Sequence, residues 1–249
     1  MILKSVMLIV CLQLPAGAAV AETLLFYDQY PPFSYKEDNK IKGLFVDVMK
    51  KAFARMNTNV EISSYPFKRA LLLAAQGKGI AIGIYKTQER EKTYLYSKPF
   101  YIDKTVLFVK KGATFPYQGI EDLVGRRIAT KLGWSYGTQF DQARKNGKFE
   151  AISGDIQDNF RRVIKNRVDA YIDNQLSGWF DAKRLGFHQQ IEELPTAVIR
   201  GKLHIISKKG TRAKIVERFN NTIEAMKKDG ALDKILSKYV VTESKRDAS

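Results

Sequence analysis

The sequence predicts an α/β protein made of two similar units. Short apolar runs rich in β-branched residues alternate with segments of helical periodicity, which is typical of strands and helices built around mostly parallel sheets. The alternation occurs twice, once before and once after Gly125. The chain has 249 residues, of which 45% are hydrophobic and 11% aromatic, so it is large enough for two medium domains or one large one.

The first unit is expected near the N-terminus. Its apolar runs predict strands at 24–27, 60–64 and 80–84, and the segments with helical spacing predict helices at 45–56 and 67–76. This order is a βαβαβ unit.

The second unit repeats the same order. We expect strands at 128–131, 149–152 and 170–172, with helices from about 135 to 143 and from 156 to 166. Because the two units share one pattern, they are expected to form two separate lobes.

Two extended apolar runs, 105–109 and 203–206, suit strands that pass between the lobes. Helices predicted at 213–228 and 231–239, punctuated by Gly210 and Gly230, are expected to pack back on the first lobe. The first lobe is then discontinuous, and small molecules are expected in the cleft between the lobes. The expected divisions are 22–104 with 203–243 for lobe 1, 105–202 for lobe 2, hinge strands near 102–107 and 198–204, and a flexible tail at 244–249.

The first residues predict export. Lys4 precedes a short apolar run at 6–14, and Ala19-Val-Ala21 is a small-x-small cleavage motif, so cleavage after Ala21 and a periplasmic location are expected. The run is too short to span a bilayer, and the mature chain is expected to carry no membrane anchor. Cys11 raises lipidation as an alternative, which Val10 disfavours because such signals have Gly or Ala there. No disulfide is expected after cleavage, since Cys11 is the only cysteine.

The net charge of +16 raises nucleic-acid binding as an alternative. Export argues against it, and the basic residues are spread along the chain with acids among them. We therefore expect no nucleic-acid partner and a basic surface that attracts anions. His188 and His204 lack metal-ligand spacing and the glycines at 77–83 lead into a strand, so no metal or cofactor is expected.

Four segments carry a family resemblance: Tyr30-Pro-Pro-Phe33, Gly43-Leu-Phe-Val-Asp47, Thr87-Gln-Glu-Arg90 and Tyr96-Ser-Lys-Pro-Phe100. In this order they resemble the family 3 periplasmic solute-binding proteins, the polar amino-acid receptors of ABC importers, over about 23–241. The resemblance implies a two-lobed periplasmic-binding-protein (Venus-flytrap) fold with two mixed, mostly parallel sheets and flanking helices. It also implies a monomer that delivers a small carboxylate or amino-acid-like ligand to an inner-membrane ABC permease and catalyses no reaction.

Lobe 1 supplies most of the site that the resemblance implies. Arg90 matches the family arginine that grips the ligand carboxylate, and a guanidinium fork suits a carboxylate well. Gly83 and Tyr85 match positions that hold the ligand through backbone groups and a small hydroxyl, although Tyr85 is larger than usual. Tyr30 and Phe67 match the aromatic residues that sandwich the ligand side chain.

Lobe 2 contributes a strand-to-helix turn whose amides complete carboxylate binding in the family. A helix N-terminus favours an anion through its free N–H groups and its dipole. Trp134 replaces a small residue and is expected either to stack on the ligand or to plug the pocket. The residues of this turn that match are Lys131, Gly133, Trp134 and Ser135.

Asp173 and Asn174 are the clearest departure. The family places an aspartate where Asn174 falls, to bind the ligand's α-ammonium group, and asparagine carries no charge. Either Asp173 or Asp28 compensates, or the ligand is a carboxylate without an amine. Two alternatives stay open: a cleft enzyme resembling cyclohexadienyl dehydratases, with Asp28, Asp173 or Glu37 as its acid, and a receptor for a membrane sensor.

Overall fold

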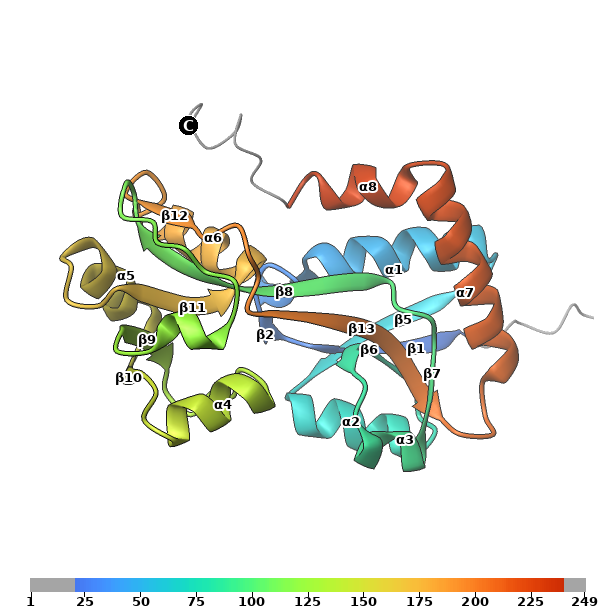
Figure 1. Ribbon diagram of the computed structural model, residues 1–249. Helices are drawn as coiled ribbons and strands as arrows, with labels where there is room; N and C mark the ends of the chain where they lie inside the picture. The colour runs from blue at the N-terminus through green and yellow to red at the C-terminus, as the bar shows by residue number, and fades with distance from the viewer. Residues whose placement is uncertain (1–20, 240–249) are drawn as a thin grey trace, which may run out of the picture.

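The computed structural model describes residues 21–239, which form two lobes joined by two long strands (Figure 1). The strands are β8 (Tyr101–Lys110) and β13 (Ile199–Lys208). Within this range no helix is both long and apolar enough to cross a membrane. Residues 1–20 of the predicted signal peptide, Cys11 among them, and the predicted tail lie outside the described residues.

One continuous sheet runs through both lobes in the order β10-β9-β11-β8-β13-β6-β1-β5. The strands at each end are parallel, whereas β8 and β13 are antiparallel to their neighbours. The two sheets expected from the sequence are thus linked through the pairing of β8 with β13, from Ile199 opposite Thr105 to Leu203 opposite Tyr101.

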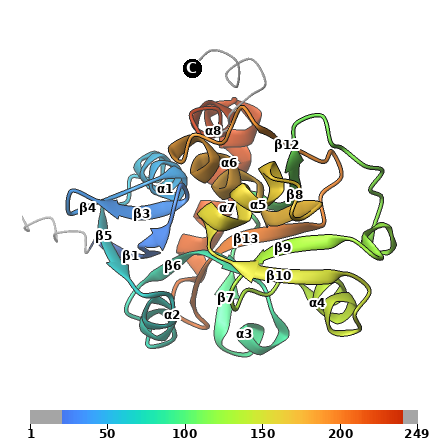
Figure 2. The ribbon, with the colours of Figure 1, turned by 90° about the vertical axis from the view of Figure 1, so that its left-hand side faces the viewer.

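Lobe 1 contains the N-terminal strands and both C-terminal helices. Figure 2 shows α1 on one face of its strands and α2 on the other, and α7 and α8 pack against α1. The elements are β1 (Glu22–Tyr27), α1 (Leu44–Arg55), β5 (Val60–Tyr65), α2 (Phe67–Ala75), β6 (Ile80–Tyr85), α3 (Gln88–Thr93), β7 (Tyr94–Tyr96), α7 (Ala213–Lys228) and α8 (Ala231–Leu236). A small separate sheet follows β1 and consists of β2 (Gln29–Tyr30), β3 (Ser34–Glu37) and β4 (Lys40–Lys42).

Lobe 2 repeats the βαβαβ order and adds a helix that the sequence reading did not predict. Its elements are the 3-10 turn η1 (Ile120–Leu123), β9 (Arg127–Lys131), α4 (Thr138–Lys145), β10 (Glu150–Gly154), α5 (Ile156–Ile164), β11 (Ala170–Asn174), α6 (Gln175–Arg184) and β12 (Ile191–Glu193). Helix α6 was missed because Gly178 weakens its helical signal. A Cβ at Gly178 would overlap the ring of Phe108, so close packing on β8 requires the glycine.

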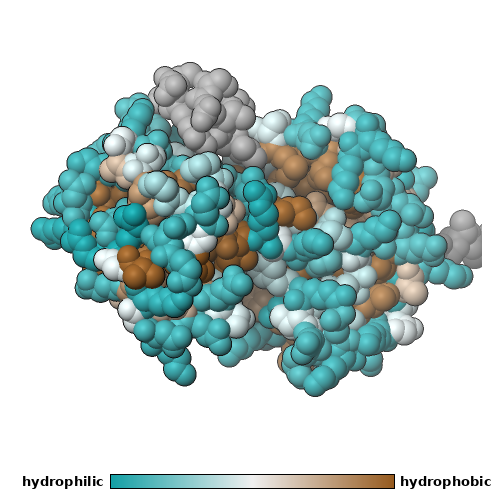
Figure 3. Space-filling model, in the orientation of Figure 1, coloured by the Kyte–Doolittle hydropathy of each residue, from teal (hydrophilic) through white to brown (hydrophobic). Residues whose placement is uncertain are grey.

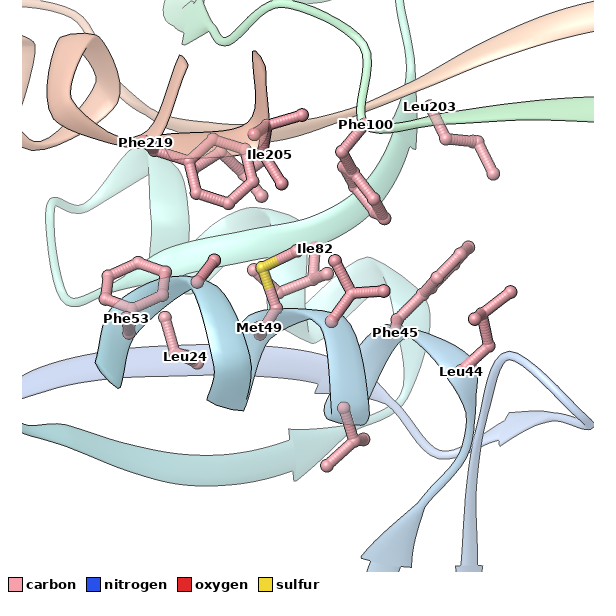
Figure 4. Packing of buried hydrophobic residues seen from close by; sticks show 14 of the residues in the cluster. Leu24, Leu44, Phe45, Met49, Phe53, Ile82, Phe100, Leu203, Ile205 and Phe219 are labelled. Carbon is pink, nitrogen blue, oxygen red and sulfur yellow. The ribbon is translucent and has the colours of Figure 1, made fainter. Parts of the chain in front are cut away.

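The core of lobe 1 is built on one face of α1. Phe45, Met49 and Phe53 are four residues apart, so their side chains share a face. Figure 4 shows Met49 and Phe53 on the side of Ile82 from β6 and Phe219 from α7, and all four are buried. Phe45 is directed toward Phe100, with ring centres 5.1 Å apart. Burial of each of these side chains contributes about 1.5–3 kcal/mol, so the packing of α1 holds α7 and the rest of the discontinuous chain on lobe 1.

Most of the molecular surface visible in Figure 3 is hydrophilic, with scattered hydrophobic patches, the larger of which lie near the middle of the face. The exposed large hydrophobic side chains include Leu132 and Trp134, which lie in one turn of lobe 2.

Candidate functional site

Arg90 is held in place at the start of α3. The Oγ1 atom of Thr87 accepts a hydrogen bond from the Arg90 amide at 3.2 Å, which caps the helix as expected. The Nη1 atom donates to the carbonyl of Tyr85 at 3.1 Å, and the guanidinium carbon lies 5.4 Å from the centre of the Phe67 ring. The side chain is half-buried and makes no ion pair with residues 21–239. A fixed, partly exposed fork of this kind is suited to bind a carboxylate.

Aromatic rings extend from Arg90 along the end of β1. Tyr27 contacts Phe67 edge-on, with ring centres 5.9 Å apart, and lies 6.4 Å from Tyr30. Tyr30 stacks on the buried Phe33 at 4.5 Å. The two rings expected to hold a ligand side chain, Tyr30 and Phe67, are therefore joined through Tyr27 in one aromatic wall.

Gly83 has a conformation that few other residues adopt. Its φ is +75°, and a Cβ there would stand 2.5 Å from the ring of Phe45. The glycine is thus required both by the backbone and by the core of lobe 1. This requirement accounts for Gly83 whether or not its backbone also contacts a ligand.

Tyr85 reaches across the sheet toward β8. Its ring lies over Gly201 of β13, where a Cβ would overlap the ring. Its hydroxyl donates a hydrogen bond to Asp103, which pairs with Gly201 in the β8–β13 ladder. Burial, and then the Asp103 charge, raise the pKa of the Tyr85 hydroxyl, so the hydroxyl stays protonated and acts as the donor.

Asp103 also contacts lobe 2. The Nδ2 atom of Asn174 donates to its other carboxylate oxygen and to the carbonyl of Lys104 at 3.2 Å. The Oδ1 atom of Asn174 caps α6 by accepting from the Ser177 amide at 3.0 Å. Asn174 is therefore engaged at both ends, and its nearest charged partner is Asp103. Burial raises the pKa of the Asp103 carboxyl, while the hydrogen bonds from Tyr85 and Asn174 oppose the rise.

Lys131 and Asp173 form a buried ion pair inside lobe 2. The Lys131 Nζ lies 2.6 Å from Asp173 Oδ1, and Asp173 is completely buried. The same carboxylate accepts from the Tyr171 hydroxyl at 2.6 Å and from the Asn174 amide at 2.7 Å. Trp134 covers Lys131, with the ammonium nitrogen 4.2 Å from its ring centre. Among the described residues, the charges of Lys131 and Asp173 thus compensate each other.

The turn after β9 differs from the expected helix start. Helix α4 begins at Thr138 and not near Ser135, because Asp141 from within the helix accepts from the Ser135 hydroxyl and from the Tyr136 amide at 3.3 Å. These bonds lie in the irregular segment 134–137 that separates the turn at 132–133 from the helix. Gly133, with φ +74°, has open space around its Cα, which leaves the backbone approachable.

An open pocket of about 550 Å³ lies on lobe 2 beside this turn. It is formed by the ends of β9 and β10 and by the first residues of α5. Lys131 is the one predicted site residue that lines it, so the pocket borders the expected site and does not contain Arg90.

The structure brings the predicted residues together in two groups. Arg90, Phe67, Tyr30 and Tyr85 form a lobe 1 group at the ends of β1 and β6. The lobe 2 group consists of Lys131, Gly133, Trp134, Ser135, Asp173 and Asn174. Asp103 links them and was missed by the sequence reading, although an acid at an inward position of an apolar hinge strand was a usable signal.

Comparison with known proteins identifies the family. Residues 23–242 match the bacterial extracellular solute-binding proteins, family 3, and the chain belongs to this family. The probable amino-acid-binding protein YxeM of Bacillus subtilis is 26% identical over 211 residues, covering 84% of this chain and 79% of YxeM. The L-cystine-binding protein TcyJ of Escherichia coli K12 is 26% identical over 215 residues, covering 84% and 79%. The second substrate-binding domain of Lactococcus lactis GlnP, in its open conformation, has a similar fold, with a TM-score of 0.75 at 18% identity over 90% of this chain and 96% of that domain. The chain is thus a solute-binding protein with the two-lobed fold expected from its sequence.

Proposed function

We propose that this protein is the periplasmic substrate-binding component of an ABC importer and captures an amino acid or a related small carboxylate. The observation that carries the proposal is Arg90, whose guanidinium is fixed against Tyr85 and Phe67, remains partly exposed and has no anionic partner among the described residues. A cation held in this way at an aromatic wall is arranged for an external carboxylate. The relatives are named as binding proteins, which supports binding without catalysis.

Capture would proceed by closure of the two lobes. Residues 22–104 with 203–243 and residues 105–202 would move as the two lobes, with hinges near 102–107 and 198–204 in β8 and β13. The ligand would dock on lobe 1 at Arg90, Tyr30 and Phe67, and the turn at 133–135 would cover it from lobe 2. Closure is stabilised because only the closed state contacts the ligand from both sides. An inner-membrane ABC permease would recognise the closed form.

The test is binding of a panel of L-amino acids and small organic acids to the mature protein, first by thermal shift and then by calorimetry. A ligand that binds only the folded protein raises its Tm. For any ligand found, we expect Arg90→Ala to raise Kd by about 30-fold or more, since it removes one partner of a charged hydrogen-bonded pair. Arg161→Ala is the matched control, because Arg161 is half-exposed on lobe 2 and lies 3.8 Å from Asp158, away from the proposed site. Unchanged affinity in Arg90→Ala would refute the carboxylate site.

A further inference from the structure

Within residues 21–239, Asp103 is a buried carboxylate without a cationic partner. It is 3% exposed, and it accepts hydrogen bonds from three neutral groups: the Tyr85 hydroxyl, the Asn174 amide and the Lys104 backbone. None of the ion pairs found between residues 21 and 239 involves Asp103. The negative charge of Asp173 repels that of Asp103.

The other acids that are buried in residues 21–239, Asp173 and Asp181, each have a cationic partner, and Arg184 lies 2.8 Å from Asp181. Asp173 has Lys131 at 2.6 Å in addition to its two neutral donors. Burying an ionised carboxylate is costly unless a cation compensates the charge, and neutral donors offset only a part of the cost. The charge of Asp103 is therefore compensated less well than that of Asp173, which is the expected condition of a site that receives its cation from outside.

The position of Asp103 is also that of a binding residue. It lies on β8, which runs between the lobes, and it is contacted by Tyr85 from lobe 1 and Asn174 from lobe 2. Tyr85 is 40% exposed and its hydroxyl donates to Asp103, so this side chain extends from the surface to the buried carboxylate. The carbonyl of Tyr85 holds Arg90, and its hydroxyl holds Asp103. One residue therefore connects a cation suited to a carboxylate with an anion suited to an ammonium group.

We propose that Asp103 binds the ammonium group of the ligand whose carboxylate is held by Arg90, and that Asn174 positions the Asp103 carboxylate. The inference rests on the proposed function and deepens it, because it selects a zwitterion over an acid without an amine. A carboxylate has about four lone-pair sites, so its acceptor capacity is not exhausted by the bonds from Tyr85, Asn174 and Lys104. Neither Asp173, which is paired with Lys131, nor Asn174, which is neutral, is then needed as the anion.

The experiment uses the mature protein with three variants: Asp103→Asn, Arg90→Ala and the control Asp158→Asn. The probes are the twenty common L-amino acids and, for each that binds, the same acid with its α-amino group replaced by hydrogen or hydroxyl. We expect at least one amino acid to bind the wild type, and its amine-free counterpart to bind at least about 30-fold more weakly. Asp103→Asn should raise the Kd of that amino acid by a similar factor. Asp158→Asn, which alters an exposed carboxylate, should bind as the wild type does.

The outcomes separate the two proposals. If Arg90→Ala loses binding while Asp103→Asn retains it, or if amine-free acids bind as well as amino acids, Asp103 is not the ammonium site and the proposed function stands. If neither variant changes Kd, the carboxylate site at Arg90 fails together with the ammonium site.

A second measurement needs no ligand. Asparagine has the shape of aspartate without its charge, so Asp103→Asn should raise the Tm of the ligand-free protein if the carboxylate is an uncompensated binding group. A lower Tm than that of the wild type would overturn the inference, because it would mean that the charge serves the fold.

Discussion

The buried pair of Lys131 and Asp173 allows a prediction about stability that can be worked from the structure. Asp173 is completely buried and the Lys131 side chain is 11% exposed, so neither charge is well solvated. Asp173→Asn preserves the shape and keeps an acceptor for the hydroxyl of Tyr171, but it leaves the ammonium of Lys131 without an anion. Removal of one partner from a buried pair costs about 3–5 kcal/mol, a large part of the roughly 5–15 kcal/mol that stabilises a typical domain.

The assay is urea unfolding followed by circular dichroism and by tryptophan fluorescence. Trp134 lies against Lys131, so fluorescence also reports the local structure. We expect Asp173→Asn and Lys131→Met each to lower the free energy of unfolding by about 3–5 kcal/mol. The double variant should lower it by much less than the sum of the two, because it leaves no unpaired charge. The control Asp158→Asn breaks an exposed pair at 3.8 Å and should change stability by about 0.5 kcal/mol or less.

A loss below about 1 kcal/mol in Asp173→Asn, or strict additivity of the two single variants, would refute this reasoning. Either result would mean that Asp173 is not held as the ionised partner of Lys131.

Three further predictions concern the lobe 1 side of the site. Gly83→Ala should lower the free energy of unfolding in urea by more than about 2 kcal/mol, because Gly83 has a positive φ and a Cβ there would meet Phe45. The control Gly112→Ala has a similar φ of +79° but open space, so it should lower this free energy by only about 1–2 kcal/mol. Equal losses in the two variants would mean that the Phe45 ring moves aside to accept the Cβ. Tyr85→Phe removes one hydrogen-bond donor from the Asp103 carboxylate and should lower the free energy of unfolding by about 1–3 kcal/mol at neutral pH. An unchanged Tm would contradict this hydrogen bond. Burial raises the pKa of the Asp103 carboxyl, so this group stays protonated to a higher pH in the folded protein than in the unfolded chain. The free energy of unfolding therefore falls as the pH rises from about 4, the unfolded pKa, through the folded pKa. The stability advantage of Asp103→Asn over the wild type should therefore grow across that window and be largest at neutral pH; a pH-independent difference in urea unfolding would exclude the raised pKa.

Local signals predicted most elements because they depend on neighbours in sequence. The apolar spacing in α1 places Phe45, Met49 and Phe53 on one face, and Thr87 caps the helix that carries Arg90. These patterns are short-range, so a single sequence is enough to recognise them. The same is true of the motifs that indicated the family and with it the two-lobed fold.

Signals that depend on distant contacts were lost. Helix α6 contains Gly178, which is unfavourable in an isolated helix and is explained only by the ring of Phe108 beneath it. The start of α4 was misplaced for a local reason, because Asp141 accepts hydrogen bonds from Ser135 and Tyr136, which are six and five residues before it. Only the contact of Gly178 with Phe108 is a tertiary contact that overrides a local preference.

The sequence by itself determined the class of this protein, its βαβαβ order and the position of Arg90, because these follow from periodicity, capping and ordered motifs. Only the tertiary structure decided which partner each buried charged side chain has. It paired Lys131 with Asp173 and placed Asp103 between Tyr85 and Asn174, residues that are far apart in sequence. The physical reason is that the state of a buried charge depends on which groups surround it in space, and strand order and lobe packing set those surroundings.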